Sequence, residues 1–234
     1  MIPWLQNPSD SFPPIEQALD EPNGLLAAGG DLSQERLVSA YRAGIFPWYS
    51  PGEPILWWSP DPRCVLIPSQ IHISKSMRKR LKKKDYTVVF NRNFAKVIDA
   101  CSAPRRGEDG TWITNEMKDA YCNLHKKGLA HSVEVYIDDE LVGGLYGLAI
   151  GKLFFGESMF SKVKDASKIA FITMVGQLEK WGYALVDCQV SNDHLFSLGA
   201  TEINRREFQL YLDQYLDEIG QTHWQFDLPA DQME

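Results

Sequence analysis

Two polar residues interrupt an apolar stretch near the C-terminal end of the sequence, YALVDCQV at residues 183–190. Asp187 and Gln189 are two positions apart, so in a β-strand both side chains point to the same face. A buried carboxylate and amide need hydrogen-bonding partners, because burying polar groups without them is costly. Neighbouring backbone could satisfy the pair. The pattern nevertheless favours a strand that ends in a working cleft.

A third candidate, Glu157, lies in the stretch richest in glycine, LVGGLYGLAIGKLFFGESMFS at residues 141–161. Five glycines fall within or beside expected strands: Gly143, Gly144, Gly147, Gly151 and Gly156. Glycine weakens a strand unless a ligand or another backbone approaches closely, or a bulge is needed. We therefore expect a sheet face kept clear for a substrate, with Glu157 reaching it from a strand end. A glutamate in open solvent is the plain alternative.

Several other chemistries find no support in the sequence. It contains no GxxxxGK[ST] loop and no GxGxxG motif after a strand, which disfavours NTP hydrolysis and nicotinamide chemistry. His131 and Ser132 are adjacent and point to opposite faces of a strand, so they cannot form a triad. No cluster has the spacing of metal ligands, and we expect no metal.

The cysteines and the hydropathy predict a cytoplasmic protein without a membrane segment. The four cysteines are scattered, which is typical of reduced thiols in the cytosol. No signal peptide begins the chain, and no run of eighteen apolar residues could span a bilayer.

Charge is concentrated in KSMRKRLKKK, residues 75–84, which holds seven of the 24 Lys and Arg residues and no acid. The rest of the chain carries 17 basic against 31 acidic residues, a net charge of −14. A cationic run on an acidic body is expected of a protein that binds a polyanion such as nucleic acid. A solvated surface helix would give the same pattern.

The elements that position these residues predict an α+β protein with two parts. Residues 1–62 read as a small, irregular N-terminal domain with one helix, capped by Ser33 and ended by Gly44. Its last segment, FPWYSPGEPILWWSPDPR at residues 46–63, is rich in proline and aromatic residues. Proline fixes φ and donates no backbone hydrogen bond, so we expect neither a helix nor an interior strand there.

Residues 63–234 have regular periodicity and predict one sheet domain. Helices are expected after the caps Asn93 and Thr114, along 171–178, and after Asn204. Strands are expected at 64–68, 86–90, 131–138, 140–150, 151–160 and 183–190. The hairpin, helix and strand of residues 139–200 resemble the GNAT acyltransferase fold. The turn that binds acetyl-CoA in that fold reads SMFSKVKDASK here and has no glycine, which disfavours CoA but not another acyl donor.

At this point longer blocks resemble a known family. EPNGLLAAGGDLS, AYRAGIFPWYSPGEPILWWSPDPR, GTWIT, AHSVEVY, LVGGLYG, FFGESMFS, DASK and DCQVSNDHLFSLGA are similar to successive blocks of the leucyl/phenylalanyl-tRNA–protein transferases, from about residue 12 to about residue 215. The resemblance implies transfer of Leu or Phe, less readily Met, from tRNA to the α-amine of proteins that begin with Arg or Lys. It implies no cofactor, and a product degraded through the N-end rule pathway.

The resemblance also implies residue roles. Asp187 would polarise or orient Gln189, which would contact the attacking amine, and Glu157 would meet the basic side chain of the acceptor's first residue. An apolar pocket would hold the aminoacyl side chain: Leu145, Phe154, Phe171, Met174, Leu178 and Val186. Aromatic residues would lie at the 3′-adenosine of the tRNA: Tyr41, Trp48, Trp112 and Tyr121. Basic residues would follow the tRNA phosphates: Lys75, Arg78, Lys79, Arg80, Lys82, Lys83 and Lys84.

Two alternatives stay open at this point. A CoA-dependent N-acetyltransferase would use the same sheet. A non-catalytic RNA-binding module would account for the basic and aromatic segments, although it would leave Asp187, Gln189 and Glu157 without a purpose. For the six apolar pocket residues, core packing is the plain alternative.

Overall fold

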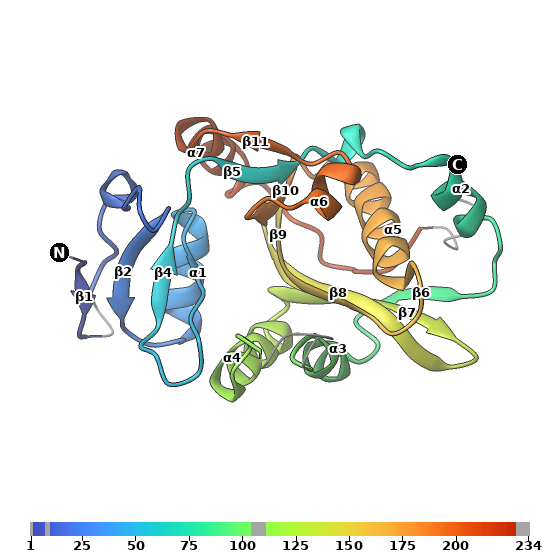
Figure 1. Ribbon diagram of the computed structural model, residues 1–234, viewed down its shortest axis with the longest axis horizontal. Helices are drawn as coiled ribbons and strands as arrows, with labels where there is room; N and C mark the ends of the chain where they lie inside the picture. The colour runs from blue at the N-terminus through green and yellow to red at the C-terminus, as the bar shows by residue number, and fades with distance from the viewer. Residues whose placement is uncertain (1, 8–9, 104–110, 228–234) are drawn as a thin grey trace.

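The computed structural model describes residues 2–7, 10–103 and 111–227, which form an α+β fold with two sheets (Figure 1). The smaller sheet has the strand order β1-β2-β4-β3. Its strands are β1 (Trp4–Leu5), β2 (Leu25–Gly29), β3 (Phe46–Pro47) and β4 (Leu56–Trp58). The helix α1 (Gln34–Arg42) lies beside this sheet, after the short 3₁₀ turn η1 (Ile15–Gln17).

This sheet corrects two expectations. The N-terminal part is not irregular, and the proline-rich segment 46–63 does contain an interior strand, because β4 lies between β2 and β3. The residues of β4 include no proline, while Pro47 lies on the edge strand β3 and Pro51 and Pro54 lie in the connection. Proline is tolerated at those places because no ladder hydrogen bond is lost there.

The larger sheet has the order β11-β5-β10-β9-β8-β7-β6, and every neighbouring pair is antiparallel except β9 and β10. Its strands are β5 (Arg63–Leu66), β6 (Thr87–Phe90), β7 (Ala130–Ile137), β8 (Glu140–Ile150), β9 (Leu153–Ser161), β10 (Leu185–Gln189) and β11 (Thr201–Ile203). The parallel pair is joined by the helix α5 (Ala166–Lys180), as a crossover connection requires.

Helices cover both faces of the larger sheet (Figure 1). One face packs against α5, and the other packs against α3 (Phe94–Cys101) and α4 (Asn115–Lys126). The remaining elements are α2 (Lys75–Leu81), α6 (Asp193–Ser197), α7 (Arg205–Tyr215) and the 3₁₀ turn η2 (Pro68–Gln70). The expected caps are confirmed, since Ser33, Asn93, Thr114 and Asn204 each accept a backbone N–H from the first helical turn.

Two hydrophobic clusters follow the alternation of the strands. Tyr146 and Phe155 point into the cluster shared with α1, α3 and α4, while Leu145 and Phe154 point into the cluster around α5. The first cluster also contains Leu37 of α1 and Trp57 of β4, so the N-terminal sheet and the larger sheet share one core. The expected boundary between residues 62 and 63 stays a prediction.

Most of the strand glycines make room for the protein itself and not for a substrate. A Cβ atom at Gly143 would lie 2.4 Å from the Cβ of Ala166 in α5, and one at Gly147 would lie 2.2 Å from the carbonyl oxygen of Phe155. A Cβ at Gly144 would lie 2.6 Å from the carbonyl oxygen of Val133. The expectation of a cleared sheet face is therefore wrong for these three residues. The expectation is also wrong for Gly151, where a Cβ would lie 2.1 Å from the carbonyl oxygen of Tyr215. Of the five glycines, only Gly156 has room for one, since a Cβ there would lie 3.5 Å from the carbonyl oxygen of Asp187.

Among the described residues, no helix combines the length and the apolar character that crossing a membrane requires. All four cysteines are free thiols.

Candidate active site

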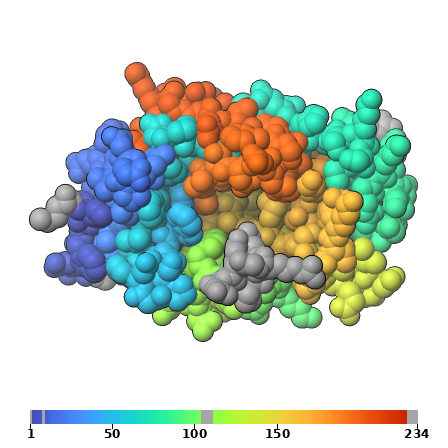
Figure 2. All heavy atoms as spheres, viewed as in Figure 1, coloured from blue at the N-terminus to red at the C-terminus, as the bar shows by residue number. Residues whose placement is uncertain are grey.

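A cleft of ≈ 1340 Å³ opens between the N-terminal sheet and the larger sheet. Its walls come from β3 and the following Trp48, from the end of α3, from Trp112, from β8 and β9, from the start of α5, from Val186 and from residues 188–195. In Figure 2 the face turned toward the viewer is hollowed between the cyan segment that holds β3 and β4, the gold strands and the orange segment after β10. Glu157 and Gln189 both line this cleft.

Glu157 is the centre of a hydrogen-bond network that joins both parts of the chain. The hydroxyl of Tyr41 in α1 donates to Glu157 Oε1 at 2.6 Å, and the hydroxyl of Tyr121 in α4 donates to Oε2 at 2.9 Å. Gln189 donates from Nε2 to Oε1 at 3.0 Å. No lysine or arginine in the described part of the chain forms an ion pair with this carboxyl group.

This environment raises the pKa of Glu157 from 4.5 to about 7. Burial is the largest cause, because it disfavours the charged form. The hydrogen bonds from Tyr41, Tyr121 and Gln189 lower the pKa in part, and the nearby charge of Asp187 raises it. A carboxyl group that titrates near neutral pH inside a cleft is a candidate for proton transfer.

Glu157 and Gln189 owe their positions to two β-bulges. In β9, Gly156 pairs with Gly147 and Ser158 pairs with Tyr146, so Glu157 is the extra residue. In β10, Asp187 pairs with Val65 and Gln189 with Cys64, which leaves Cys188 as the extra residue. Bulges redirect side chains and are over-represented beside active sites.

The bulge in β10 corrects the geometry expected from the sequence. Gln189 has a φ of 64°, a left-handed conformation that is uncommon outside glycine. Regular alternation therefore does not hold between Asp187 and Gln189. Gln189 lines the cleft, whereas Asp187 is 0% exposed and is absent from its walls.

Asp187 forms a buried, bidentate ion pair with Arg63 at the start of β5. The distances are 2.8 Å from Arg63 Nε to Asp187 Oδ1 and 2.7 Å from Nη2 to Oδ2. The guanidinium lies between the rings of Phe46 and Phe208, with its carbon 4.8 and 4.7 Å from their centroids. Arg63 also donates to the carbonyl oxygen of Gly44 at 3.2 Å. One arginine thus ties the N-terminal part and α7 to the strand that carries Gln189.

The contact between Asp187 and Gln189 runs through the backbone. Asp187 Oδ1 accepts the backbone N–H of Gln189 at 2.9 Å, which holds the left-handed residue in place. Asp187 does not line the cleft, and its contact with Gln189 is this backbone hydrogen bond. The sequence interpretation missed Arg63. The available signal was an arginine that opens the apolar strand RCVL.

The expected apolar pocket lies on the wall formed by β8, β9, α5 and β10. Five of the six residues line the cleft, namely Leu145, Phe154, Phe171, Met174 and Val186. Leu178 does not line it. That residue lies one helical turn beyond Met174 and is packed in the core around α5, so its assignment to the pocket is corrected.

The four aromatic residues fall into two groups. Trp48, 47% exposed, and the half-buried Trp112 line the cleft and offer ring surface to a base. Tyr41 and Tyr121 are 0% exposed, and their hydroxyls bind Glu157. Stacking on the terminal adenosine is therefore wrong for these two tyrosines, because both ring faces are covered. Sequence patterns identify an aromatic residue but not which of its atoms will be accessible.

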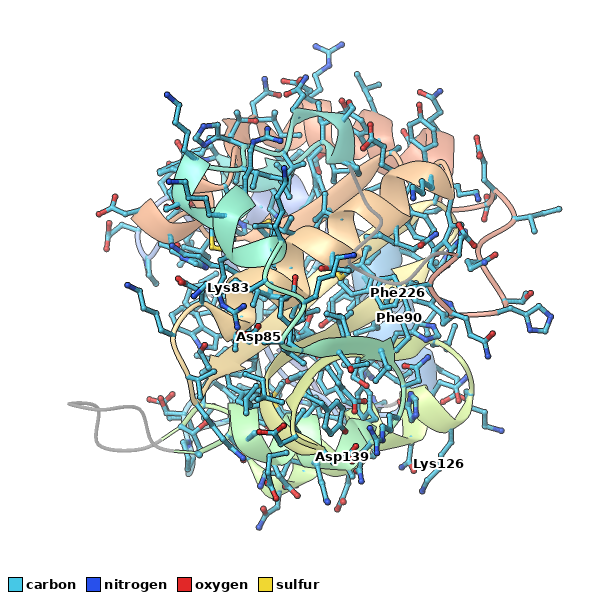
Figure 3. All side chains as sticks on the ribbon, turned by 90° about the vertical axis from the view of Figure 1, so that its right-hand side faces the viewer. Lys83, Asp85, Phe90, Lys126, Asp139 and Phe226 are labelled. Carbon is cyan, nitrogen blue, oxygen red and sulfur yellow. The ribbon has the colours of Figure 1, made fainter. Side chains whose placement is uncertain are left out.

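The basic residues lie on α2 and the segment after it, at the end of the molecule opposite β1 (Figure 1). Met77 anchors this short helix in the core. Six of the seven cationic side chains are exposed, namely Lys75, Arg78, Lys79, Lys82, Lys83 and Lys84. Arg80 is committed to an ion pair with Asp85 and stacks on Tyr86, so it is a weaker candidate for a phosphate contact. Figure 3 shows Lys83 and Asp85 on the segment that follows α2.

Two buried hydroxyl groups, those of Tyr146 and Ser158, have no hydrogen-bond partner among the described residues. Tyr146 of β8 is 0% exposed, and its register partner Ser158 lies across the β8–β9 ladder. Both residues line the cleft.

Comparisons with known proteins agree on one family. The family model described as "Leucyl/phenylalanyl-tRNA protein transferase" matches residues 65–213, and the model for the N-terminal domain of the same family matches residues 30–61. A leucyl/phenylalanyl-tRNA–protein transferase of Pseudomonas putida strain W619 is 58% identical over 96% of this chain and 99% of its own. The Azotobacter vinelandii protein of the same name is 59% identical with the same coverage.

A solved structure of L-PGS from Bacillus licheniformis is only distantly similar, at 15% identity and a TM-score of 0.41 over 72% of this chain and 54% of that chain. The two family models, in contrast, span every residue that lines the cleft. The chain therefore belongs to the leucyl/phenylalanyl-tRNA–protein transferase family.

Proposed function

We propose that this aminoacyltransferase moves leucine or phenylalanine, and less readily methionine, from an aminoacyl-tRNA to the α-amine of a protein that begins with Arg or Lys. The observation that carries this proposal is the cleft, in which an apolar wall faces a carboxyl group that has no cationic partner among the described residues. The wall suits an apolar aminoacyl side chain, and the carboxyl group suits a positively charged chain start. The product would carry a signal for degradation.

The reaction needs little beyond alignment and proton transfer. The ester of an aminoacyl-tRNA is already activated, and an α-amine has an ordinary pKa of about 7.7–8.0, so part of it is nucleophilic at neutral pH. Holding amine and ester together can supply much of the acceleration. Because Gln189 Nε2 donates to Glu157, its Oε1 is left to accept an N–H of the attacking amine.

The tRNA would be held at its end and along its stem. The exposed ring of Trp48, with Trp112, would stack on the unpaired terminal adenosine. The exposed cations of α2 and residues 82–84 would contact acceptor-stem phosphates. The β8–β9 hairpin, α5 and the parallel β9–β10 pair support a GNAT-like arrangement of the larger sheet. The cytoplasmic location stays a prediction.

The test is a transfer assay with purified protein. Leu-tRNA is incubated with a peptide that begins with Arg, and the peptide mass is measured. We expect an increase of one leucine residue, no increase with an N-acetylated copy of the peptide, and none when acetyl-CoA replaces the tRNA. Transfer of an acetyl group, or no modification at all, would overturn the proposal.

A further inference from the structure

Glu157, Tyr41 and Tyr121 form a ring of oxygen atoms. Tyr41 Oη lies 2.6 Å from Glu157 Oε1, Tyr121 Oη lies 2.9 Å from Glu157 Oε2, and the two hydroxyl oxygens lie 2.5 Å apart. All three separations are hydrogen-bond distances, and each such contact requires a proton between its oxygens. Both tyrosine side chains are 0% exposed, so water does not replace one contact of the ring.

The number of protons in the three contacts of this ring depends on whether Glu157 is ionised. The two tyrosine hydroxyls supply one proton each. When Glu157 is ionised, one of the three oxygen–oxygen contacts therefore has no proton. When Glu157 is protonated, all three contacts can be filled in one direction. Oε2–H then donates to Tyr121, Tyr121 donates to Tyr41, and Tyr41 donates to Oε1. Gln189 occupies the other lone pair of Oε1, which places the acid proton on Oε2.

We propose that this ring is the proton acceptor of the transfer reaction, in which ionised Glu157 takes a proton from the α-ammonium group of the acceptor. The inference rests on the proposed function. It places Glu157 in contact with the α-amine of the acceptor protein, whereas the family resemblance implies that Glu157 contacts the side chain of the acceptor's first residue. Glu157 lines the cleft and is partly exposed there, so an amine can reach it.

The acceptor enters as R–NH₃⁺, and one proton passes to the Glu157 carboxylate, which leaves a neutral amine and a neutral carboxylic acid. The amine nitrogen forms a bond with the ester carbonyl carbon, and the bond from that carbon to the 3′-oxygen of the tRNA breaks. The second amine proton goes to the leaving 3′-oxygen. Glu157 then releases its proton to solvent before the next turnover.

The α-amine that gives up the proton and the Glu157 carboxyl group that takes it have similar pKa values. Burial raises the pKa of Glu157 to about 7, close to the 7.7–8.0 of an α-amine, so the proton exchange is unfavourable by no more than about tenfold. The titratable and charged groups that face Glu157 from the packed elements are Tyr41 of α1, Tyr121 of α4, Tyr146 of β8 and Asp187 of β10, the last one paired with Arg63 of β5.

The experiment compares wild type with Glu157→Gln from pH 6.5 to pH 9.5, with Phe-tRNA and a peptide that begins with Arg. Glutamine mimics protonated glutamate, because its amide N–H can donate to Tyr121 and its oxygen can accept from Tyr41, so the variant should fold. The measured quantity is kcat/KM for the peptide. Glu179→Gln, an exposed residue at the end of α5, is the matched control and should follow wild type at every pH.

We expect the loss in Glu157→Gln to be largest near pH 7 and to shrink by up to about tenfold per pH unit above pH 8, as the free amine becomes abundant. Contact of Glu157 with the acceptor's Arg side chain predicts a different result, because arginine stays charged throughout. The loss would then be constant between pH 8 and pH 9.5, and that result would overturn the inference.

A second measurement needs no activity. Carbon-13 NMR of carboxyl-labelled glutamate in the resting protein should show one carboxyl group that titrates near pH 7 and is missing in Glu157→Gln. Its absence from the wild-type spectrum would also overturn the inference. If wild type transfers no amino acid at any pH, the proposed function fails, and the NMR result still reports on the ring.

Discussion

Replacing Asp187 should lower the free energy of unfolding of the protein, even though Asp187 lies outside the cleft. In Asp187→Leu the buried guanidinium of Arg63 loses its counter-ion and stays between Phe46 and Phe208. Removing one partner of a buried ion pair costs about 3–5 kcal/mol. Both side chains are almost fully covered, at 1% and 0% exposure, so we expect a loss of stability in this range. Urea unfolding followed by tryptophan fluorescence measures it.

The double variant Arg63→Met/Asp187→Leu separates folding from catalysis. Replacing a buried ion pair with apolar side chains of similar volume is often neutral, so the double variant should regain most of the lost stability. Transfer should stay low, because the backbone N–H of Gln189 still lacks its acceptor and Gln189 loses its left-handed conformation. A misplacement of about 1 Å costs about 100-fold in rate.

The kinetic constants give the sharper test. We expect kcat to fall by about 100-fold in the double variant, while KM for the aminoacyl-tRNA changes little, because neither residue lines the cleft. Recovery of transfer together with stability would show that Asp187 serves folding alone and would refute the positioning role.

Three further predictions follow from the same contacts. The unfolding free energy of wild type, relative to that of Glu157→Gln, should fall as pH rises from 4.5 to 7 and then level off, by up to about 3 kcal/mol, because the folded state keeps a proton that the unfolded state loses. This is measured by urea unfolding between pH 4 and pH 8, and parallel curves would contradict it. Replacing Lys82, Lys83 and Lys84 with Gln should reduce the slope of log K against log[salt] for tRNA binding by about 2–3, whereas Arg80→Gln should change it little. Trp48→Ala should weaken aminoacyl-tRNA binding by about 1–3 kcal/mol, while Tyr41→Phe, whose ring is covered, should leave that affinity unchanged in a filter-binding assay.

Most elements of the larger sheet could be predicted because their signals are local, although the short edge strand β11 (Thr201–Ile203) was not expected. The caps Asn93, Thr114 and Asn204 and the apolar stripes behind them lie within a few residues of one another, and the structure has helices at those places. The N-terminal sheet could not be predicted in the same way. Its strands have two to five residues, too few for periodicity to appear, and β1 pairs with β2 across about twenty residues.

The active-site residues were found by type, but their contacts were not. Tyr41 and Glu157 are 116 positions apart, and Arg63 and Asp187 are 124 apart, so no local pattern links them. The bulges at Glu157 and Cys188 break the alternation on which strand predictions depend. Glycines were misread for a related reason, since a strand glycine gives the same signal whether a ligand or the protein's own backbone fills the space.

The carboxyl groups of Asp187 and Glu157 have opposite surroundings, and the contrast fits the separate roles that we propose for them. Asp187 faces a fixed, buried cation, so its charge is satisfied within the protein and it can only hold the backbone of Gln189. Within the described part of the chain, Glu157 accepts hydrogen bonds from neutral donors. A lysine in place of Tyr41 or Tyr121 would fix the carboxylate charge and compete with the acceptor amine. Tyrosine hydroxyls support the carboxyl group without adding charge, which leaves the cationic partner to be supplied by the incoming chain.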